Sequence, residues 1–265
     1  MVDYKTKANE CRKKVLQMIH EAGTSHIASN FSCIDFATVL YENLKSEDKV
    51  VWSAGWKAAT IYYFLAKQGF IPESDLDLFG KEVDGEVKYL GLVETTTPGI
   101  YANSGSMGHG LPIACGMALA KKMKGEPGTI YCIMSDGEMN EGTTWECAMF
   151  AYTHELDNLI VIVDANKWQA MGKTSEVLKV GVTKIVDPFL GFGWCADDID
   201  GHDYGQIHES LVEDFDPNKS RLVGPTVVVC NTIKGKGVSF MEDHLLFHYK
   251  HVDETEYLKA KAELC

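Results

Sequence analysis

Thr129-Ile-Tyr-Cys-Ile-Met-Ser-Asp-Gly-Glu138 joins an apolar run to an acidic turn that contains a glycine, and it is the most informative segment of the chain. A second apolar run, Leu159-Ile-Val-Ile-Val163, ends shortly before Asn166. The segment between the two runs is long enough for one helix, which predicts a strand–turn–helix–strand unit. In a parallel unit of this kind both strands end at the same edge of the sheet. Asp136 and Asn166 are therefore expected to converge where open α/β folds bind ligands.

The residue types at these two strand ends indicate a metal–phosphate site. A carboxylate and an amide oxygen suit Mg²⁺ or Ca²⁺, which prefer oxygen ligands and often carry a phosphate. Gly137 lets the backbone come close to that phosphate because it has no Cβ. Asp-Gly is also common turn chemistry, so Asp136 and Gly137 alone would be weak support. The spacing to Asn166 favours the metal interpretation.

The composition is that of an ordinary globular protein. The chain has 265 residues, 45% of them apolar and 24% charged, which fits one large domain. A net charge of −13 argues against nucleic acid or an anionic membrane as a partner. We see neither a signal peptide nor an apolar stretch of the ~18 residues that span a membrane, so a cytoplasmic protein is expected. The eight cysteines form no CxxC pairs, which favours reduced, buried thiols.

The rest of the chain extends the central unit into an α/β fold. Helices are expected at 4–22, 33–43 and 55–67 and after Gly110, and strands at 49–53, 191–199 and 225–230. Ser32 and Asp35 are expected to form a capping box for the second helix. Residues 70–104 have no regular pattern, which is typical of a functional loop. The prediction is a single α/β domain over residues 1–265, a doubly wound parallel sheet with helices on both faces.

Five motifs together resemble one family, the thiamine-diphosphate enzymes of the transketolase group, and in particular their N-terminal, diphosphate-binding half. In chain order the motifs are Gly105-Ser-Met-Gly-His-Gly110, Ser135-Asp-Gly-Glu-Met-Asn-Glu-Gly142, Asp164-Ala-Asn166, Asp200-Gly-His-Asp203 and Lys234-Gly-Lys-Gly237. The resemblance covers nearly the whole chain, and the ordered set is more specific than any single motif. It implies the thiamine-diphosphate-binding fold of the diphosphate-binding type.

The resemblance implies how thiamine diphosphate and Mg²⁺ (or Ca²⁺) would be held. Asp136, Asn166 and the main-chain carbonyl of Trp168 match the metal ligands of the family, and Gly137 would donate its N–H to the diphosphate. The other positions that match cofactor contacts are Ser29, Gly105, Ser106, Met107, Glu138, Lys234 and His248. The turn at 105–107 begins a helix, where free N–H groups favour an anion, although glycines there also permit close packing.

Three residues match catalytic positions of the family. His26 lies where the family has a glycine–histidine turn whose imidazole faces the thiazolium and the substrate. Glu141 matches a glutamate that reaches across the dimer interface; the alternative is an exposed first-turn glutamate beside the helix dipole. His248 follows Lys234 at a family spacing in which both approach the diphosphate or the substrate.

Two other polar residues, Glu138 and His109, allow two interpretations each. Glu138 could contact the cofactor or could be a solvated carboxylate, and His109 could be a site residue or a structural histidine. His202 and Asp203 are expected to serve the turn and the helix cap rather than catalysis.

The chain departs from the family pattern at three positions. Trp56 replaces a histidine that faces the cofactor, and Leu92 replaces one that contacts the hydroxyl of the transferred two-carbon unit. Ser135 replaces the first glycine of the usual Gly-Asp-Gly, which is a smaller change. A buried polar contact of this kind contributes ~1–3 kcal/mol, so the substrate pocket is expected to be altered.

The resemblance implies the N-terminal subunit of a split, transketolase-like enzyme that transfers a two-carbon ketol unit from a ketose to an aldehyde. A separate C-terminal transketolase-like subunit would supply the glutamate that activates the cofactor's pyrimidine ring, in an α₂β₂ assembly. Two alternatives stay open. One is a thiamine-diphosphate enzyme that decarboxylates a 2-oxo acid or transfers an acyl group. The other is a non-catalytic cofactor-binding subunit.

Overall fold

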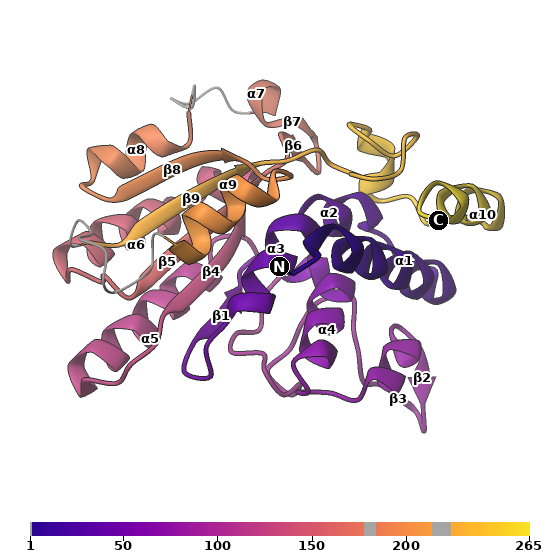
Figure 1. Ribbon diagram of the computed structural model, residues 1–265, viewed down its shortest axis with the longest axis horizontal. Coiled ribbons are helices and arrows are strands. Elements are labelled where there is room, and N and C mark those ends of the chain that lie inside the picture. Colours follow the sequence, from indigo (N-terminus) through magenta and orange to yellow (C-terminus); the bar gives the residue numbers. More distant parts are fainter. Residues whose placement is uncertain (1, 178–183, 214–223) are drawn as a thin grey trace.

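The structure, a computed structural model, describes residues 2–177, 184–213 and 224–265. Its centre is a five-stranded sheet with the strand order β1-β4-β5-β9-β8. The strands are Lys49–Trp52 (β1), Ile130–Ser135 (β4), Leu159–Ala165 (β5), Cys195–Asp200 (β8) and Thr226–Asn231 (β9). All neighbouring pairs are parallel, which confirms the predicted parallel sheet (Figure 1).

Helices cover both faces of this sheet. On one side of the sheet lie Tyr4–Ala22 (α1), Ile27–Ser32 (α2), Ile34–Asn43 (α3), Ala58–Lys67 (α4) and Tyr204–His208 (α9), and Glu254–Glu263 (α10) packs on α1. The other side packs against Gly110–Lys124 (α5), Gly142–Thr153 (α6) and Val186–Gly191 (α8). Side chains of β5 alternate between the two cores, Ile160 and Ile162 on the first and Val161 and Val163 on the second. The predicted double winding is confirmed.

Short elements connect the sheet to the helices. They are the 3₁₀ turns Gly55–Lys57 (η1), Glu73–Leu78 (η2), Asp136–Asn140 (η3) and Leu245–His248 (η5), the π turn Glu209–Glu213 (η4) and the short helix Thr174–Val177 (α7). Two small hairpins pair Glu82–Val83 (β2) with Glu86–Val87 (β3) and Trp168–Gln169 (β6) with Gly172–Lys173 (β7). The first hairpin and η2 lie in the segment that was expected to be irregular.

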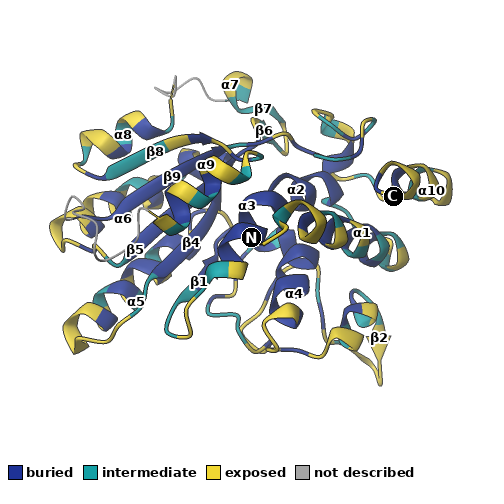
Figure 2. Cartoon of the chain, in the orientation of Figure 1, coloured by how far each residue is buried: buried dark blue, intermediate teal, exposed yellow. Residues whose placement is uncertain are grey.

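Local sequence explains where the first helix begins and ends. Asp3 caps α1 by accepting a hydrogen bond from the N–H of Thr6 at 3.1 Å. Gly23 ends the helix in the left-handed region, with φ 61°, where glycine has no steric penalty. Figure 2 shows that α10, packed on α1, is exposed on its outer side, whereas the strands β4, β5 and β9 are buried.

The predicted capping box at Ser32 and Asp35 is wrong. The expected helix at 33–43 is preceded by α2, and the chain bends at Cys33, which has no side-chain cap. Ser32 instead donates to a carboxylate oxygen of Asp164 at 2.6 Å, and Asp35 pairs with Arg12 at 2.6 Å. Buried polar groups need partners, and here those partners lie on other segments of the chain.

Two further expectations can be compared with the structure. The strand expected at 191–199 begins only at Cys195, because residues 186–191 belong to α8. The expected buried thiols are present at Cys11, Cys33, Cys115, Cys132 and Cys230. Within the described ranges, every helix is too short or too polar to cross a membrane.

Candidate functional site

A cavity of about 230 Å³ lies at the edge of the sheet where β4 and β5 end. The predicted cofactor contacts on its wall are Ser29, Gly105, Met107 and Gly137. The predicted ligands or catalytic residues on its wall are His26, Asn166, Trp168 and His248. Residues from widely separated parts of the sequence therefore meet at the edge that the strand pattern predicted.

Asp136 has the surroundings of a metal ligand. It begins η3 directly after β4, and its side chain is buried. Oδ2 accepts a hydrogen bond from the N–H of Lys167 at 2.7 Å, whereas Oδ1 is one of the few buried atoms without a partner among the described residues. Burial, together with the nearby Asp164, raises the pKa of Asp136 to about 7. A buried carboxylate oxygen left unbonded is costly, and a bound cation would remove that cost.

Asn166 and Trp168 supply further oxygen atoms next to Asp136. Nδ2 of Asn166 donates to Asp164 at 3.0 Å, and Oδ1 accepts from the N–H of Trp168 at 3.1 Å. An amide oxygen has two lone pairs, so Oδ1 can still bind a cation. No cluster of three His, Cys, Asp or Glu side chains that could hold a metal occurs in the described part of the chain. A site of one carboxylate, one amide and one carbonyl fits Mg²⁺ or Ca²⁺.

Glu138 is buried and fixes the glycine-rich turn to the end of β4. Its carboxylate accepts from the N–H of Ser135 at 2.9 Å, from the N–H of Gly108 at 3.2 Å and from the hydroxyl of Ser53. Burial raises the pKa of Glu138. The solvated interpretation is therefore wrong, and a cofactor contact for Glu138 stays a prediction.

The turn at 105–110 reaches the cavity next to one of the altered positions. Gly105 has φ 139°, and a Cβ added there would lie 2.8 Å from Cδ2 of Leu92. Leu92 is half exposed beside this turn, and Trp56 lies on the cavity wall. Both residues that replace family histidines are thus next to the site, and Ser135, the third departure, also lies on the cavity wall.

Lys234, Ser29 and the two histidines form one cluster. The buried ammonium of Lys234 donates to Oγ of Ser29 at 2.8 Å and to Nδ1 of His248 at 3.0 Å. The rings of His26 and His248 are 5.0 Å apart. Desolvation, then the charge of Lys234, lowers the pKa of His26 to about 4 and that of His248 to about 3. Both imidazoles are therefore neutral near pH 7.

His26 is held in an uncommon backbone conformation. Its φ is 69°, in the left-handed region that residues other than glycine rarely adopt. Its N–H donates to the carbonyl of His248 at 3.0 Å, and its own carbonyl accepts from Asn30. Nδ1 lies 2.7 Å from Oγ of Ser25. These contacts fix the imidazole on the cavity wall.

The Asp200–Asp203 turn supports the Lys234 loop from outside the cavity. Asp203 caps α9 by accepting from the N–H of Gly205 at 2.8 Å, which confirms its expected role. His202 does more than serve the turn: Nδ1 bonds to Asp35 at 2.7 Å and Nε2 accepts from the N–H of Ile233 at 2.9 Å.

Ser106, His109 and Glu141 do not lie on the cavity wall in the described part of the chain. Ser106 and His109 are exposed, and Glu141 is half-buried at the start of α6. Glu141 packs beside Gly108, since a Cβ there would be 2.8 Å from its own Cβ. The roles implied for Ser106 and Glu141 stay predictions.

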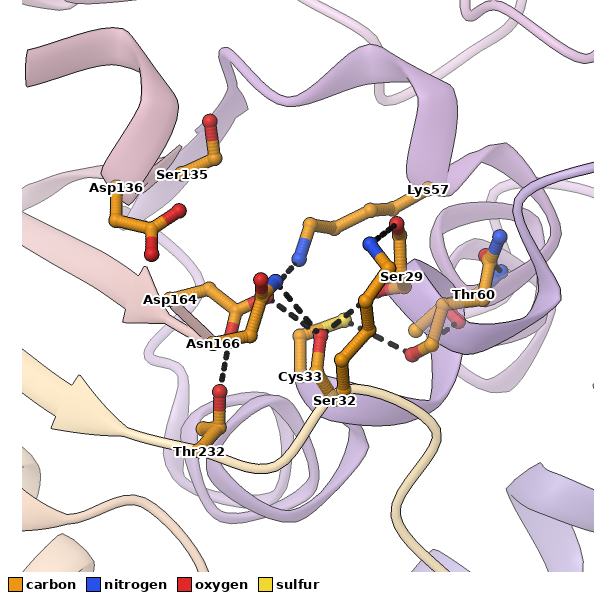
Figure 3. Close-up of polar contacts among 12 residues, drawn as sticks. Ser29, Ser32, Cys33, Lys57, Thr60, Ser135, Asp136, Asp164, Asn166 and Thr232 are labelled. Atoms are coloured by element: carbon orange, nitrogen blue, oxygen red, sulfur yellow. Dashed lines mark hydrogen bonds and ion pairs between the residues drawn. The ribbon is translucent and has the colours of Figure 1, made fainter. Parts of the chain in front are cut away.

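Sequence reasoning did not identify Lys57 or the side-chain role of Asp164. Both side chains are fully buried, and they form an ion pair behind Asn166 (Figure 3). The sequence did contain a signal for this pair. Each of the two charged residues borders a strongly apolar run, which indicates burial, and a buried charge usually has a partner of opposite charge.

Comparisons with known proteins agree with this geometry. The family described as "Transketolase, thiamine diphosphate binding domain" matches residues 4–265. The chain is 34% identical to 6-deoxy-6-sulfo-D-fructose transketolase subunit SqwG of Clostridium sp., over 99% of this chain and 96% of that one. It is 31% identical to an apulose-4-phosphate transketolase subunit of Phocaeicola vulgatus, over 96% of this chain and 90% of that one.

Solved structures show the same fold. Transketolase from Campylobacter jejuni superposes with a TM-score of 0.88 at 28% identity, over 98% of this chain. This chain spans only 42% of the length of that transketolase.

The chain belongs to the transketolase family and matches its thiamine diphosphate-binding domain. Its class is that of a transketolase-like, thiamine-diphosphate-dependent transferase subunit.

Proposed function

We propose that this chain is a single thiamine-diphosphate-binding domain and the N-terminal subunit of a split transketolase-like enzyme. It would hold the diphosphate through Mg²⁺ or Ca²⁺ and act with a separate C-terminal subunit on a ketose donor and an aldehyde acceptor. The observation that carries this proposal is the unbonded, buried Oδ1 of Asp136 beside the amide of Asn166, in a chain of this family.

The diphosphate end of the cofactor has a suitable environment. Asp136, Asn166 and the carbonyl of Trp168 would hold the metal, and the N–H of Gly137 would contact the diphosphate. Lys234 adds a positive charge. Burial and the nearby Lys57 lower the pKa of Lys234 to about 8, so its ammonium group is mostly protonated at pH 7. Local cations must neutralise the diphosphate because the whole chain has a net charge of −13.

The chemistry divides between the cofactor and the chain. When bound, thiamine diphosphate supplies the electron-accepting chemistry for breaking and forming carbon–carbon bonds. Lys234 donates to Nδ1 of His248, so the neutral ring carries its proton on Nε2. His248 can therefore donate a hydrogen bond to an oxygen atom of a ligand in the cavity. His26, also neutral, can donate or accept a proton at the same wall.

The substrate would be a specialised ketose rather than the usual sugar phosphates. Trp56 and Leu92 replace two hydrogen-bonding histidines of the family with apolar side chains, and Trp56 lies on the cavity wall. The names of two relatives refer to 6-deoxy-6-sulfo-D-fructose and to apulose-4-phosphate. A pocket with fewer hydrogen-bonding groups should select a donor that needs fewer of them.

A partner chain would complete the site in an α₂β₂ assembly. Both relatives are named as subunits. The outer sides of α5 and α6 expose apolar residues: Ile113 (38%), Met149 (48%), Phe150 (39%) and Tyr152 (50%). Glu141 lies at the start of α6, the helix that carries three of these residues near its end. An apolar surface of this kind is typical of a protein–protein interface.

The test begins with cofactor binding. Thiamine diphosphate should quench the fluorescence of Trp56 and Trp168 in the presence of Mg²⁺ or Ca²⁺ but not in the presence of EDTA. Asp136→Ala should abolish the effect. Equal quenching with EDTA would contradict the metal site.

Activity is then assayed with the partner chain, which we expect to be encoded next to this one. Aldehyde-dependent ketol transfer should require both chains. Transfer by this chain alone would contradict the split enzyme, and carbon dioxide release from a 2-oxo acid would instead support the decarboxylase. Cofactor binding without any turnover would support the non-catalytic alternative.

A further inference from the structure

Lys57 is a cation buried directly behind the candidate metal site. It follows Trp56 of the cavity wall, but its own side chain is fully buried and turns into the protein. Its ammonium forms an ion pair with Asp164, which is equally buried near the end of β5 (Figure 3). The cost of desolvating a buried ion pair can exceed the attraction between its charges. A contribution to stability therefore does not by itself explain why this pair lies next to the candidate metal site.

Asp164 collects hydrogen-bond donors from four segments of the chain. Oδ2 accepts from Lys57, from the hydroxyl of Ser32 at 2.6 Å and from Nδ2 of Asn166 at 3.0 Å. Oδ1 accepts from the hydroxyl of Thr232. A carboxylate that is paired with an ammonium group is ionised, so it can accept hydrogen bonds but cannot donate one. It must therefore be faced by the NH₂ group of Asn166 and not by the amide oxygen.

This requirement determines which way the amide of Asn166 points. Its NH₂ group lies toward Asp164 and Ser32, at 3.0 and 3.4 Å, so its oxygen faces the other way. Asn166 lies on the cavity wall, and the carboxylate of Asp136 is at the end of the neighbouring strand. The amide oxygen is the atom that would bind the cation.

We propose that Lys57 is a positioning residue for the metal site. Through Asp164 it fixes the amide of Asn166 so that the oxygen, and not the NH₂ group, faces a divalent cation. The inference rests on the proposed function, because it assumes that a cation binds at Asp136 and Asn166.

Two other roles for Lys57 give different results. If Lys57 acted on the metal only by charge, its removal would take a positive charge away from a cation site and strengthen cation binding. If the pair were only structural, its loss would lower stability and leave the affinity for the cation unchanged. A positioning role alone predicts weaker cation binding. Partners that orient metal ligands typically change metal affinity by about 10–100-fold.

The experiment measures the affinity of the full-length chain for Mn²⁺ at saturating thiamine diphosphate, from the electron paramagnetic resonance signal of free Mn²⁺. Lys57→Met removes the ammonium and keeps a side chain of similar length. In case this variant does not fold, Lys57→Met/Asp164→Leu replaces the ion pair by two apolar side chains, a change that proteins often tolerate. Leu16→Ala in α1 is the matched control, because it removes buried volume at a residue that does not line the cavity.

We expect the dissociation constant for Mn²⁺ to rise roughly 10–100-fold in both Lys57 variants and to stay unchanged in Leu16→Ala at a similar loss of Tm. An unchanged or lower dissociation constant in both variants would overturn the inference while the proposed function stands. If the wild-type chain itself does not bind Mn²⁺ with thiamine diphosphate, the proposed function fails and this inference fails with it.

Discussion

The ammonium of Lys234 donates a hydrogen bond to Nδ1 of His248 at 3.0 Å, and this contact determines which ring nitrogen of His248 can donate a hydrogen bond to a ligand. Because the ring is neutral, its single proton lies on Nε2. His248→Gln places an NH₂ group close to that position, whereas His248→Ala removes the donor. We expect kcat/KM for ketol transfer to fall about 10–100-fold in the alanine variant and less in the glutamine variant. Equal losses of kcat/KM in both variants would show that the N–H donor of His248 does not contribute to ketol transfer.

Lys234 should make cofactor binding depend on pH. Its pKa is lowered to about 8, chiefly by desolvation, so the positive charge beside the diphosphate is lost as pH rises through 8. The dissociation constant for thiamine diphosphate at saturating Mg²⁺ should be level between pH 6.5 and 7.5. It should then rise by up to about tenfold per pH unit above 8. Calorimetric titrations from pH 6.5 to 9.5 test this, and a flat profile would contradict the contact. In Lys234→Met the rise should disappear.

Asp136→Asn should stabilise the chain without metal while it abolishes metal-dependent cofactor binding. The pKa of Asp136 is raised from 3.8 to about 7, so the wild-type chain loses stability as pH rises from about 4 to 7. The asparagine variant lacks this loss. The gain in free energy of unfolding should therefore be small at pH 4.5 and reach on the order of 2–4 kcal/mol at pH 8. Urea unfolding at both pH values, with EDTA present, measures it. A gain independent of pH would refute the explanation.

Trp56→His combined with Leu92→His should shift the donor preference toward the usual sugar phosphates. Each histidine restores one hydrogen-bonding group, worth about 1–3 kcal/mol when its partner is buried. We expect kcat/KM for xylulose 5-phosphate to rise at least tenfold relative to the wild type. Phe70→His, an exposed change away from the cavity, is the control. No change in the double variant would mean that other positions, or the partner chain, determine the donor.

Arg12→Met should be strongly destabilising although Arg12 is far in sequence from the candidate metal ligands. Arg12 donates to Asp35 at 2.6 Å and to the carbonyl of Lys236 at 3.0 Å. Its removal leaves the buried carboxylate of Asp35 bonded to His202 and Tyr204 without the guanidinium, so we expect a loss of about 3–5 kcal/mol. Thermal unfolding measures this, and Lys14→Met, which breaks a more exposed pair with Asp77, should cost less than about 1 kcal/mol.

The sequence predicted the parts of the site that depend on strand ends. Apolar runs locate β4 and β5, and the polar residues that follow them must lie at one edge of a parallel sheet. For this reason Asp136 and Asn166 could be placed before the structure was known. His26 and Lys234 were located only through the family resemblance. A residue in a loop has no periodic sequence pattern that would indicate its position.

What could not be predicted depends on contacts between distant segments. Ser32 had the spacing of a helix cap, but its hydroxyl bonds to Asp164, on the far side of the sequence. Glu138 had two interpretations, a cofactor contact or a solvated carboxylate, and the structure encloses it between Ser53 and the 105–110 turn. No local pattern distinguishes these outcomes, because burial of a polar side chain depends on which segments fold over it.

The ion pair between Lys57 and Asp164 constrains how this sequence can evolve. Changing either residue alone leaves a charge buried without its counterion, so the two positions cannot drift independently. Replacement of the pair would require two mutations in the same lineage, with a less stable intermediate between them. We expect related sequences to carry both residues or neither. The pair would then serve as a marker for chains that share this arrangement behind the candidate metal site.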